Sequence, residues 1–153
     1  MTEVVDTLFI YDQRVDAHWI CAEQPSEHAL VVLAESGYKG VLNLGLHEAP
    51  YALEDEAASV TNLKMRYHHI PVSFTNPQVA SYEAFAAFLD TIKGQKWLIH
   101  CADNKRVSIF MALYQLQQQA WSTQKAVLWI AQAWQPDRVW AEFLGQVRER
   151  MLA

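Results

Sequence analysis

The sequence predicts an α/β fold with a central, mainly parallel sheet and helices on both faces. Short apolar stretches alternate along the chain with longer segments of helical periodicity, which is the pattern of such folds. Hydrophobic residues make up 52% of the 153 residues and charged residues 19%, as is typical of a folded protein with a substantial core. At this length we expect one domain spanning residues 1–153.

Five stretches are predicted to form strands. The first two, at residues 8–11 and 17–21, are separated by a polar turn at 12–14. The other three lie further along the chain, at residues 40–44, 65–70 and 96–99. Because helical segments connect these later strands, we expect them to run parallel.

Helical patterns fill the connections. The first begins near Ser26 and ends before Gly37, and the second places the acidic run 54–56 in its first turn. Ser81 is expected to cap the third helix. Three more helical patterns follow in the C-terminal third, and Asp137 is expected to cap the last of them.

Charge and cysteine content exclude several classes of function. The net charge of −5 argues against a nucleic-acid or anionic-membrane surface, and no apolar stretch is long enough to span a bilayer. Cys21 and Cys101 are too few for a disulfide framework, so we expect free thiols in the cytoplasm. The histidines match no metal-ligand spacing, and we expect neither a metal nor an organic cofactor.

The strongest functional signal is a His-Cys pair at the end of the last expected strand. Parallel sheets bind ligands at this end of their strands. If the backbone N–H groups after the cysteine turn inward, they and the dipole of the next helix create an anion site. The segment reads His100-Cys101-Ala102-Asp103-Asn104-Lys105-Arg106-Val107-Ser108.

Four side chains of this loop suit an anion. Cys101 is expected to have a lowered pKa and to act as a thiolate nucleophile. Asn104 tolerates the left-handed backbone conformation that a tight loop needs. Arg106 places a cation in the first helical turn, where it opposes the helix dipole, so an anionic partner would explain its placement. Ser108 can hydrogen-bond a thiolate or an oxyanion. The alternative is a small buried cysteine beside a solvated arginine.

The loop resembles the signature loop of cysteine-dependent protein tyrosine and dual-specificity phosphatases, where five residues separate His-Cys from Arg and Ser or Thr. Asn104, Arg106 and Ser108 match a variant of the small bacterial phosphatase-like branch, which reads Arg-x-Ser. Aligned at equal loop length, Val107 occupies the usual arginine position. Three further segments support the resemblance in order, namely Gln24-Pro25-Ser26, Val41-Leu42-Asn43-Leu44 and His69-Ile70-Pro71-Val72.

The resemblance implies a dual-specificity-phosphatase-like fold and a two-step hydrolysis. Cys101 would attack phosphorus to form a cysteinyl-phosphate, which water then hydrolyses. Backbone amides of residues 102–107 would hold the phosphate oxygens, Arg106 would add charge, and Ser108 would help the thiolate to leave. The implied substrate is a phosphorylated protein or a small phosphate ester.

The aspartate that the family uses as general acid has no counterpart on residues 72–77, which contain no carboxylate. Asp103, Glu48 and Asp55 are the candidate substitutes, whereas Asp137 is expected only to cap a helix. Two other functions stay open. One is a non-catalytic module that binds phosphate or phosphopeptides. The other is a rhodanese-like sulfurtransferase, because the cysteine and arginine of the rhodanese active loop are spaced as Cys101 and Arg106 are here.

Overall fold

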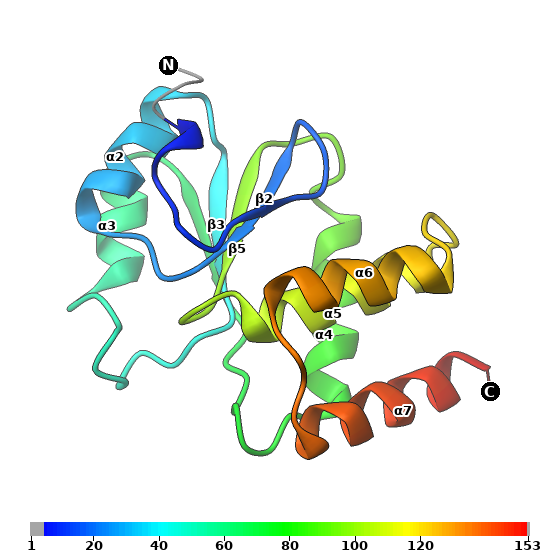
Figure 1. Cartoon of the computed structure of the whole chain (residues 1–153). Coiled ribbons are helices and arrows are strands. Elements are labelled where there is room, and N and C mark those ends of the chain that lie inside the picture. The colour runs from blue at the N-terminus through cyan, green and yellow to red at the C-terminus, as the bar shows by residue number, and fades with distance from the viewer. Residues whose placement is uncertain (1–4, 153) are drawn as a thin grey trace.

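The computed structural model describes residues 5–152 and is built around a five-stranded sheet (Figure 1). The strands follow the order β1-β2-β5-β3-β4, and only the β1–β2 pair is antiparallel. They are β1 (Gln13–Arg14), β2 (Trp19–Ala22), β3 (Gly40–Asn43), β4 (Arg66–His69) and β5 (Trp97–His100). The mainly parallel sheet that the sequence predicts is therefore confirmed.

Helices cover both faces of the sheet, as predicted. Helices α2 (Glu27–Glu35) and α3 (Glu56–Asn62) pack on the face that carries Ile20, Val41 and Leu98. The other face is covered by α4 (Val79–Asp90), α5 (Lys105–Gln117), α6 (Thr123–Ala133) and α7 (Arg138–Leu152) (Figure 1). Within residues 5–152, no helix combines the length and the apolar character needed to cross a membrane.

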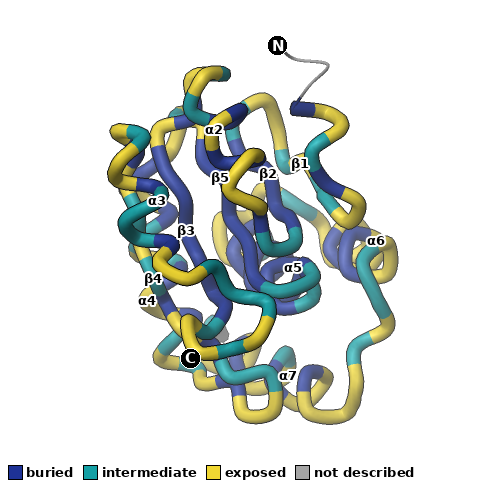
Figure 2. The backbone as a smooth tube through the Cα atoms, turned by 90° about the vertical axis from the view of Figure 1, so that its left-hand side faces the viewer, coloured by how far each residue is buried: buried dark blue, intermediate teal, exposed yellow. Residues whose placement is uncertain are grey.

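The central strands are buried on both faces, which explains their apolar sequences. β2, β3 and β5 are buried along their whole length, whereas the edge strand β4 alternates between exposed and half-buried residues (Figure 2). In the parallel register Ala22 pairs with His100, and Asn43 pairs with both His100 and His69. These strands therefore end at one edge, where the loops that follow them meet.

The N-terminal segment differs from its prediction. Residues 8–11 form no strand, and the edge strand β1 lies where the sequence predicts a turn. The carboxylate of Glu23 accepts hydrogen bonds from the backbone N–H groups of Ile10 (2.7 Å) and Tyr11 (3.1 Å). Because this carboxylate satisfies donors that strand pairing would use, the segment forms an irregular loop beside the end of β2.

The helix caps are mostly those that the sequence predicts. Ser26 and Asp137 cap α2 and α7, since each side chain accepts a backbone N–H bond three residues further on, both at 3.0 Å. The predicted cap at Ser81 is wrong, because α4 already begins at Val79. The N–H of Ser81 donates to the carbonyl of Gln78 (3.0 Å), so Ser81 lies within the first turn.

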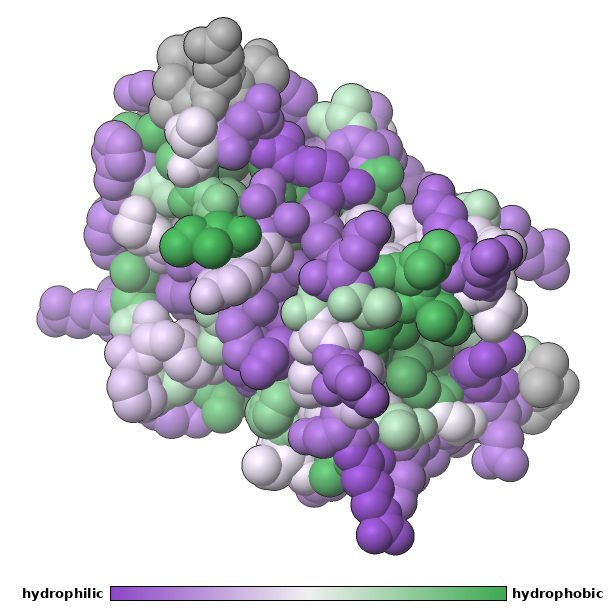
Figure 3. Space-filling view, viewed as in Figure 1, coloured by the Kyte–Doolittle hydropathy of each residue, from purple (hydrophilic) through white to green (hydrophobic). Residues whose placement is uncertain are grey.

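An apolar groove of about 380 Å³ lies between α6 and α7. In Figure 3, apolar side chains gather over α6 and the gap beside it. The groove is lined by Val127, Ile130, Ala131, Trp134, Gln135, Pro136 and Leu144. Its wall is joined to the first turn of α5, because the indole N–H of Trp134 donates to the hydroxyl of Ser108 (3.1 Å).

Candidate active site

The segment from Cys101 to Ser108, called the Cys101 loop below, consists of a tight turn after β5 (residues 101–104) and the first turn of α5 (residues 105–108). Asn104 has left-handed backbone angles (φ 71°, ψ −2°), and α5 begins immediately after it. The backbone N–H groups of Val107 and Asp103 donate hydrogen bonds to the Cys101 sulfur. These donors and the N-terminal end of α5 give the surroundings of the sulfur a positive partial charge.

Burial dominates the ionisation of Cys101. The residue has no exposed surface, and this burial raises the pKa of its thiol above the ordinary value. The charge of Arg106 and the amide bonds from Val107 and Asp103 oppose that rise without cancelling it. The lowered pKa that the sequence predicts is therefore wrong for this structure, because loss of water around the sulfur outweighs the donors.

Arg106 is a buried cation (4% exposed) without a carboxylate partner among residues 5–152. Its Nη1 donates to the carbonyl of Val72 (2.8 Å) and its Nη2 to the hydroxyl of Tyr51 (3.3 Å). The guanidinium carbon lies 5.9 Å from the ring centre of Tyr51 and 5.7 Å from that of Phe74. The buried Nε has no hydrogen-bond partner. Because an unpaired buried charge is costly, this arrangement indicates a place for an anion.

Asn104 joins the loop to the N-terminal segment. Its Nδ2 donates to the carbonyl of Tyr11 and to Oε1 of Gln13, both at 2.9 Å. The side chain is fully buried, and its Oδ1 has no partner. The conformation of the Cys101 loop therefore depends on the irregular segment that packs beside it.

Three polar side chains of the loop bind local partners. The Asp103 carboxylate accepts the backbone N–H of Lys105 (3.2 Å) and lies 3.7 Å from its ammonium group. The Ser108 hydroxyl donates to the carbonyl of Lys105 (2.6 Å) and accepts from Trp134. The Ser108 proton is thus directed to the backbone, and the donors on the Cys101 sulfur are amides.

Ala102 is bound through its backbone to the end of β2, whereas Val107 is buried in the apolar core. The carbonyl of Ala102 accepts the N–H of Gln24 (3.1 Å), which ties the loop to the end of β2. Val107 is fully buried within the apolar cluster around α5. Because Val107 stands at the usual arginine position of the family and carries no charge, the cation that acts on Cys101 is Arg106, one residue earlier.

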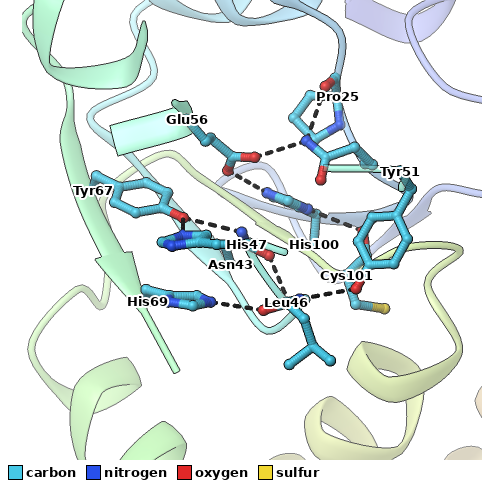
Figure 4. A network of polar contacts seen from close by, with 12 residues as sticks. Pro25, Asn43, Leu46, His47, Tyr51, Glu56, Tyr67, His69, His100 and Cys101 are labelled. Atoms are coloured by element: carbon cyan, nitrogen blue, oxygen red, sulfur yellow. Dashed lines mark hydrogen bonds and ion pairs between the residues drawn. The ribbon is translucent and has the colours of Figure 1, made fainter. Parts of the chain in front are cut away.

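A buried carboxylate lies behind the cysteine. Glu56 Oε2 lies 2.6 Å from His100 Nε2, and its Oε1 accepts a hydrogen bond from Gln24 (2.7 Å) (Figure 4). His100 Nδ1 lies 3.0 Å from the carbonyl of Cys101 and must carry a hydrogen, because a carbonyl only accepts. Burial raises the pKa of Glu56, but the bonds and charge of His100, with Gln24, outweigh burial and lower it. This chain of contacts fixes the backbone at the cysteine.

The histidines of the neighbouring loops form a stack. His47 stacks on His69 with 3.7 Å between ring centres, and its Nε2 lies 2.6 Å from the hydroxyl of Tyr67. His69 Nε2 lies 2.7 Å from the carbonyl of Gly45, and burial lowers its pKa. In the described part of the chain, no three His, Cys, Asp or Glu side chains are placed to share a metal ion. The stack instead holds the loop after β3 against β4.

Most of the carboxylates proposed as general acids are engaged elsewhere. Asp55 accepts the N–H of Ala58 (3.1 Å) as the N-cap of α3. Asp137, expected only as a helix cap, does cap α7. Asp103 is bound to Lys105, as described above. Glu48 is exposed on the loop after β3. None of these carboxylates is therefore held at the site as a proton donor, and another side chain must protonate the leaving group.

Two residues near the loop escape sequence reasoning, Glu56 and Tyr51. Glu56 carries only the signal of an acidic residue at a helix start. The Tyr51 hydroxyl accepts the N–H of Leu46 (2.8 Å), and Figure 4 shows it directed toward Leu46 and Cys101. A Cβ at Gly45 would come within 3.1 Å of the Tyr51 hydroxyl and ring, so glycine makes room for this ring. No local pattern marks Tyr51, because its contact with Arg106 joins positions 55 residues apart in the sequence.

Several solved structures that resemble this fold are described as phosphatases or putative phosphatases. A crystal structure from Shewanella putrefaciens CN-32, described as a "putative phosphatase (DUF442)", is 30% identical, with 99% of each chain covered and a TM-score of 0.86. Tk-PTP in its active form is 20% identical, with 92% of this chain and 97% of that chain covered and a TM-score of 0.75. PTPMT1 in complex with PI(5)P is 17% identical, with 94% and 97% covered and a TM-score of 0.76. No protein-family profile and no curated protein matches the chain.

These similarities define the class as phosphatases that share the fold of Tk-PTP and PTPMT1. Within that class, the identity along nearly the whole chain shows that the protein belongs to the DUF442 family. The resemblance that the Cys101 loop suggests is therefore confirmed, and it supports a function of the phosphatase type.

Proposed function

We propose that the protein hydrolyses phosphate monoesters through a cysteinyl-phosphate on Cys101, within one phosphatase-like domain spanning residues 1–153. The observation that carries this proposal is the buried Arg106, which has no carboxylate partner among residues 5–152 and an unpartnered Nε. The charge of Arg106 acts electrostatically on Cys101, whose sulfur accepts hydrogen bonds from backbone amides. A bound phosphate supplies the negative charge that this arrangement lacks.

The reaction takes place in two steps. The Cys101 thiolate attacks phosphorus, an S–P bond forms, and the ester P–O bond breaks with its electron pair moving to the leaving oxygen, which takes a proton. Water then attacks phosphorus, the S–P bond breaks, and phosphate and thiolate separate. Amides of residues 102–107 and the Arg106 guanidinium stabilise the charge on the phosphate oxygens. Neither a metal nor an organic cofactor takes part in this route.

The side chains of the loop serve mainly to hold its shape. Asn104 supplies the left-handed turn. The Asp103 carboxylate accepts the backbone N–H of Lys105, and the Ser108 hydroxyl donates to the carbonyl of the same residue. Ser108 therefore acts on the departing thiolate through the amides that it keeps in place. This assigns to the backbone the role that the family resemblance gives to the hydroxyl.

The proposed substrate is a phosphorylated protein or a small phosphate ester in the cytoplasm. PTPMT1, which shares the fold, has been solved with a phosphoinositide bound. The absence of a disulfide between Cys21 and Cys101, which are both free and buried, suits a reducing compartment.

Hydrolysis of para-nitrophenyl phosphate without added metal tests the proposal. We expect turnover by the native protein and its loss in Cys101→Ser, with both proteins folded by circular dichroism. Cys21→Ser is the matched control, since it removes the other buried thiol, and it is expected to keep turnover. Equal activity of the native protein and Cys101→Ser would contradict the proposal.

A binding module without turnover is the second candidate. It is favoured by the raised thiol pKa of Cys101 and by the lack of a carboxylate on residues 72–77. Saturable binding of inorganic phosphate, lost in Arg106→Met, together with no turnover of any ester would identify it. A persulfide on Cys101 after treatment with thiosulfate would instead identify a rhodanese-like sulfurtransferase.

A further inference from the structure

The first step of the proposed reaction needs a proton on the leaving oxygen, and the loop after β4 offers no carboxylate to provide it. We propose that Tyr51 is the general acid that protonates the leaving oxygen. This inference rests on the proposed function, because it assigns a role in that same reaction. It replaces a carboxylate on one loop with a phenol on the loop after β3.

The hydrogen bonds of Tyr51 leave its proton available. Its oxygen accepts the N–H of Leu46 (2.8 Å) and an Nη2–H of Arg106 (3.3 Å). A phenol has one proton to donate, and an N–H cannot accept it. No acceptor for this proton lies within hydrogen-bond distance in the described part of the chain. The O–H bond is therefore free to turn toward an incoming ligand.

The position of Tyr51 couples it to the phosphate site. Arg106 contacts the Tyr51 hydroxyl and also acts electrostatically on Cys101, so the phenol lies at the cation that would hold the phosphate. The ring packs above Gly45, where a side chain would displace it. Leu46 and Arg106 hold the oxygen from two directions, which fixes a donor at the edge of the proposed site.

The same contacts suit the chemistry of an acid. When the ester P–O bond breaks, the electron pair on the leaving oxygen takes the Tyr51 proton, and the product leaves as a neutral alcohol. The resulting phenolate is stabilised by the Arg106 guanidinium and the Leu46 amide. In the second step, the attacking water gives its proton to the phenolate as its oxygen binds phosphorus, which restores Tyr51 and the Cys101 thiolate.

Two rival donors are less well placed. His47 is stacked on His69, and its Nε2 is occupied by the Tyr67 hydroxyl. Glu48 lies in solvent on the same loop as Tyr51. A fixed donor at the site is favoured over an exposed one, because catalysis by proton transfer requires hydrogen-bond contact with the leaving oxygen.

The test compares two substrates on Tyr51→Phe. Phenyl phosphate has a poor leaving group and needs an acid, whereas para-nitrophenyl phosphate needs little help. We expect kcat/KM for phenyl phosphate to fall about 10²-fold and that for para-nitrophenyl phosphate to change far less. The ratio of the two values is independent of the folded fraction. Tyr11→Phe, at an exposed tyrosine beside the loop, is the matched control and is expected to keep the native ratio.

An equal loss on both substrates would show a merely structural role and overturn the inference. A selective loss on phenyl phosphate in Glu48→Gln, with Tyr51→Phe unchanged, would overturn it in favour of Glu48. Native protein that hydrolyses neither ester would refute the proposed function, and the inference with it. Each failure is therefore distinguishable from the others.

Discussion

Two buried charged groups lie on either side of Cys101, and they differ in how they are satisfied. Behind the cysteine, the Glu56 carboxylate is bound by His100 and Gln24, with both of its oxygens occupied. In front of it, the Arg106 guanidinium has only neutral partners and an unpartnered Nε. Both groups are almost fully buried, so burial alone does not distinguish them.

The difference separates a structural role from a binding role. A fully paired buried carboxylate holds its neighbours in place, and removing one partner leaves the other uncompensated. A buried cation without a counter-charge is unfavourable for folding and is relieved when an anion binds. We therefore expect Glu56 to matter chiefly for stability and Arg106 chiefly for function.

The largest expected effect comes from Arg106→Met, which removes the unpaired charge and keeps most of the side-chain volume. Loss of the phosphate-binding cation should lower kcat/KM for para-nitrophenyl phosphate by about 10³-fold. The free energy of unfolding in urea should stay unchanged or rise, because a costly charge is removed. A variant that unfolds more easily while keeping its activity would reverse the roles assigned to the two groups.

The next largest effect is expected from Glu56→Ala. It leaves His100 and Gln24 without their partner, and we expect a loss of about 3 to 5 kcal/mol in the free energy of unfolding. Urea denaturation followed by tryptophan fluorescence measures this loss. Glu54→Ala is the matched control, since Glu54 is exposed two residues away, and it should change stability by less than about 0.5 kcal/mol.

The smallest expected effect is the pH dependence of the Glu56 contribution. The pKa of Glu56 is lower in the folded protein than its ordinary value of 4.5, so its charge stabilises the fold above that pH. As pH falls through the folded pKa, the carboxylate takes up a proton and this contribution disappears. The stability difference between native protein and Glu56→Gln should therefore be fully present well above pH 4.5 and should shrink as the pH falls below that value. A difference that does not change with pH would show that ionised Glu56 is not stabilising.

Much of the fold follows from the sequence because it rests on local patterns. Apolar strands, helical periodicity and caps such as Ser26 depend on neighbouring residues, and the parallel sheet follows from their alternation. The segment at 8–11 fails for the opposite reason, since a carboxylate from the end of β2 takes its backbone donors. Contacts between distant segments decide that detail.

The same distinction applies to the site. The Cys101 loop is continuous in sequence, so its residue types alone indicate an anion site. Glu56 and Tyr51 lie 45 and 50 residues before Cys101 in the sequence, and nothing near them indicates their contacts with His100 and Arg106. The raised thiol pKa of Cys101 also depends on burial, which the loop sequence alone does not determine.

Trapping of the intermediate tests the central claim most directly. Native protein mixed with para-nitrophenyl phosphate, quenched rapidly in acid and digested, should yield the peptide containing Cys101 with one phosphoryl group by mass spectrometry. The same peptide from Cys101→Ser should lack the thiol-linked group. Turnover by the native protein with no phosphoryl group on Cys101 at any quench time would contradict the account.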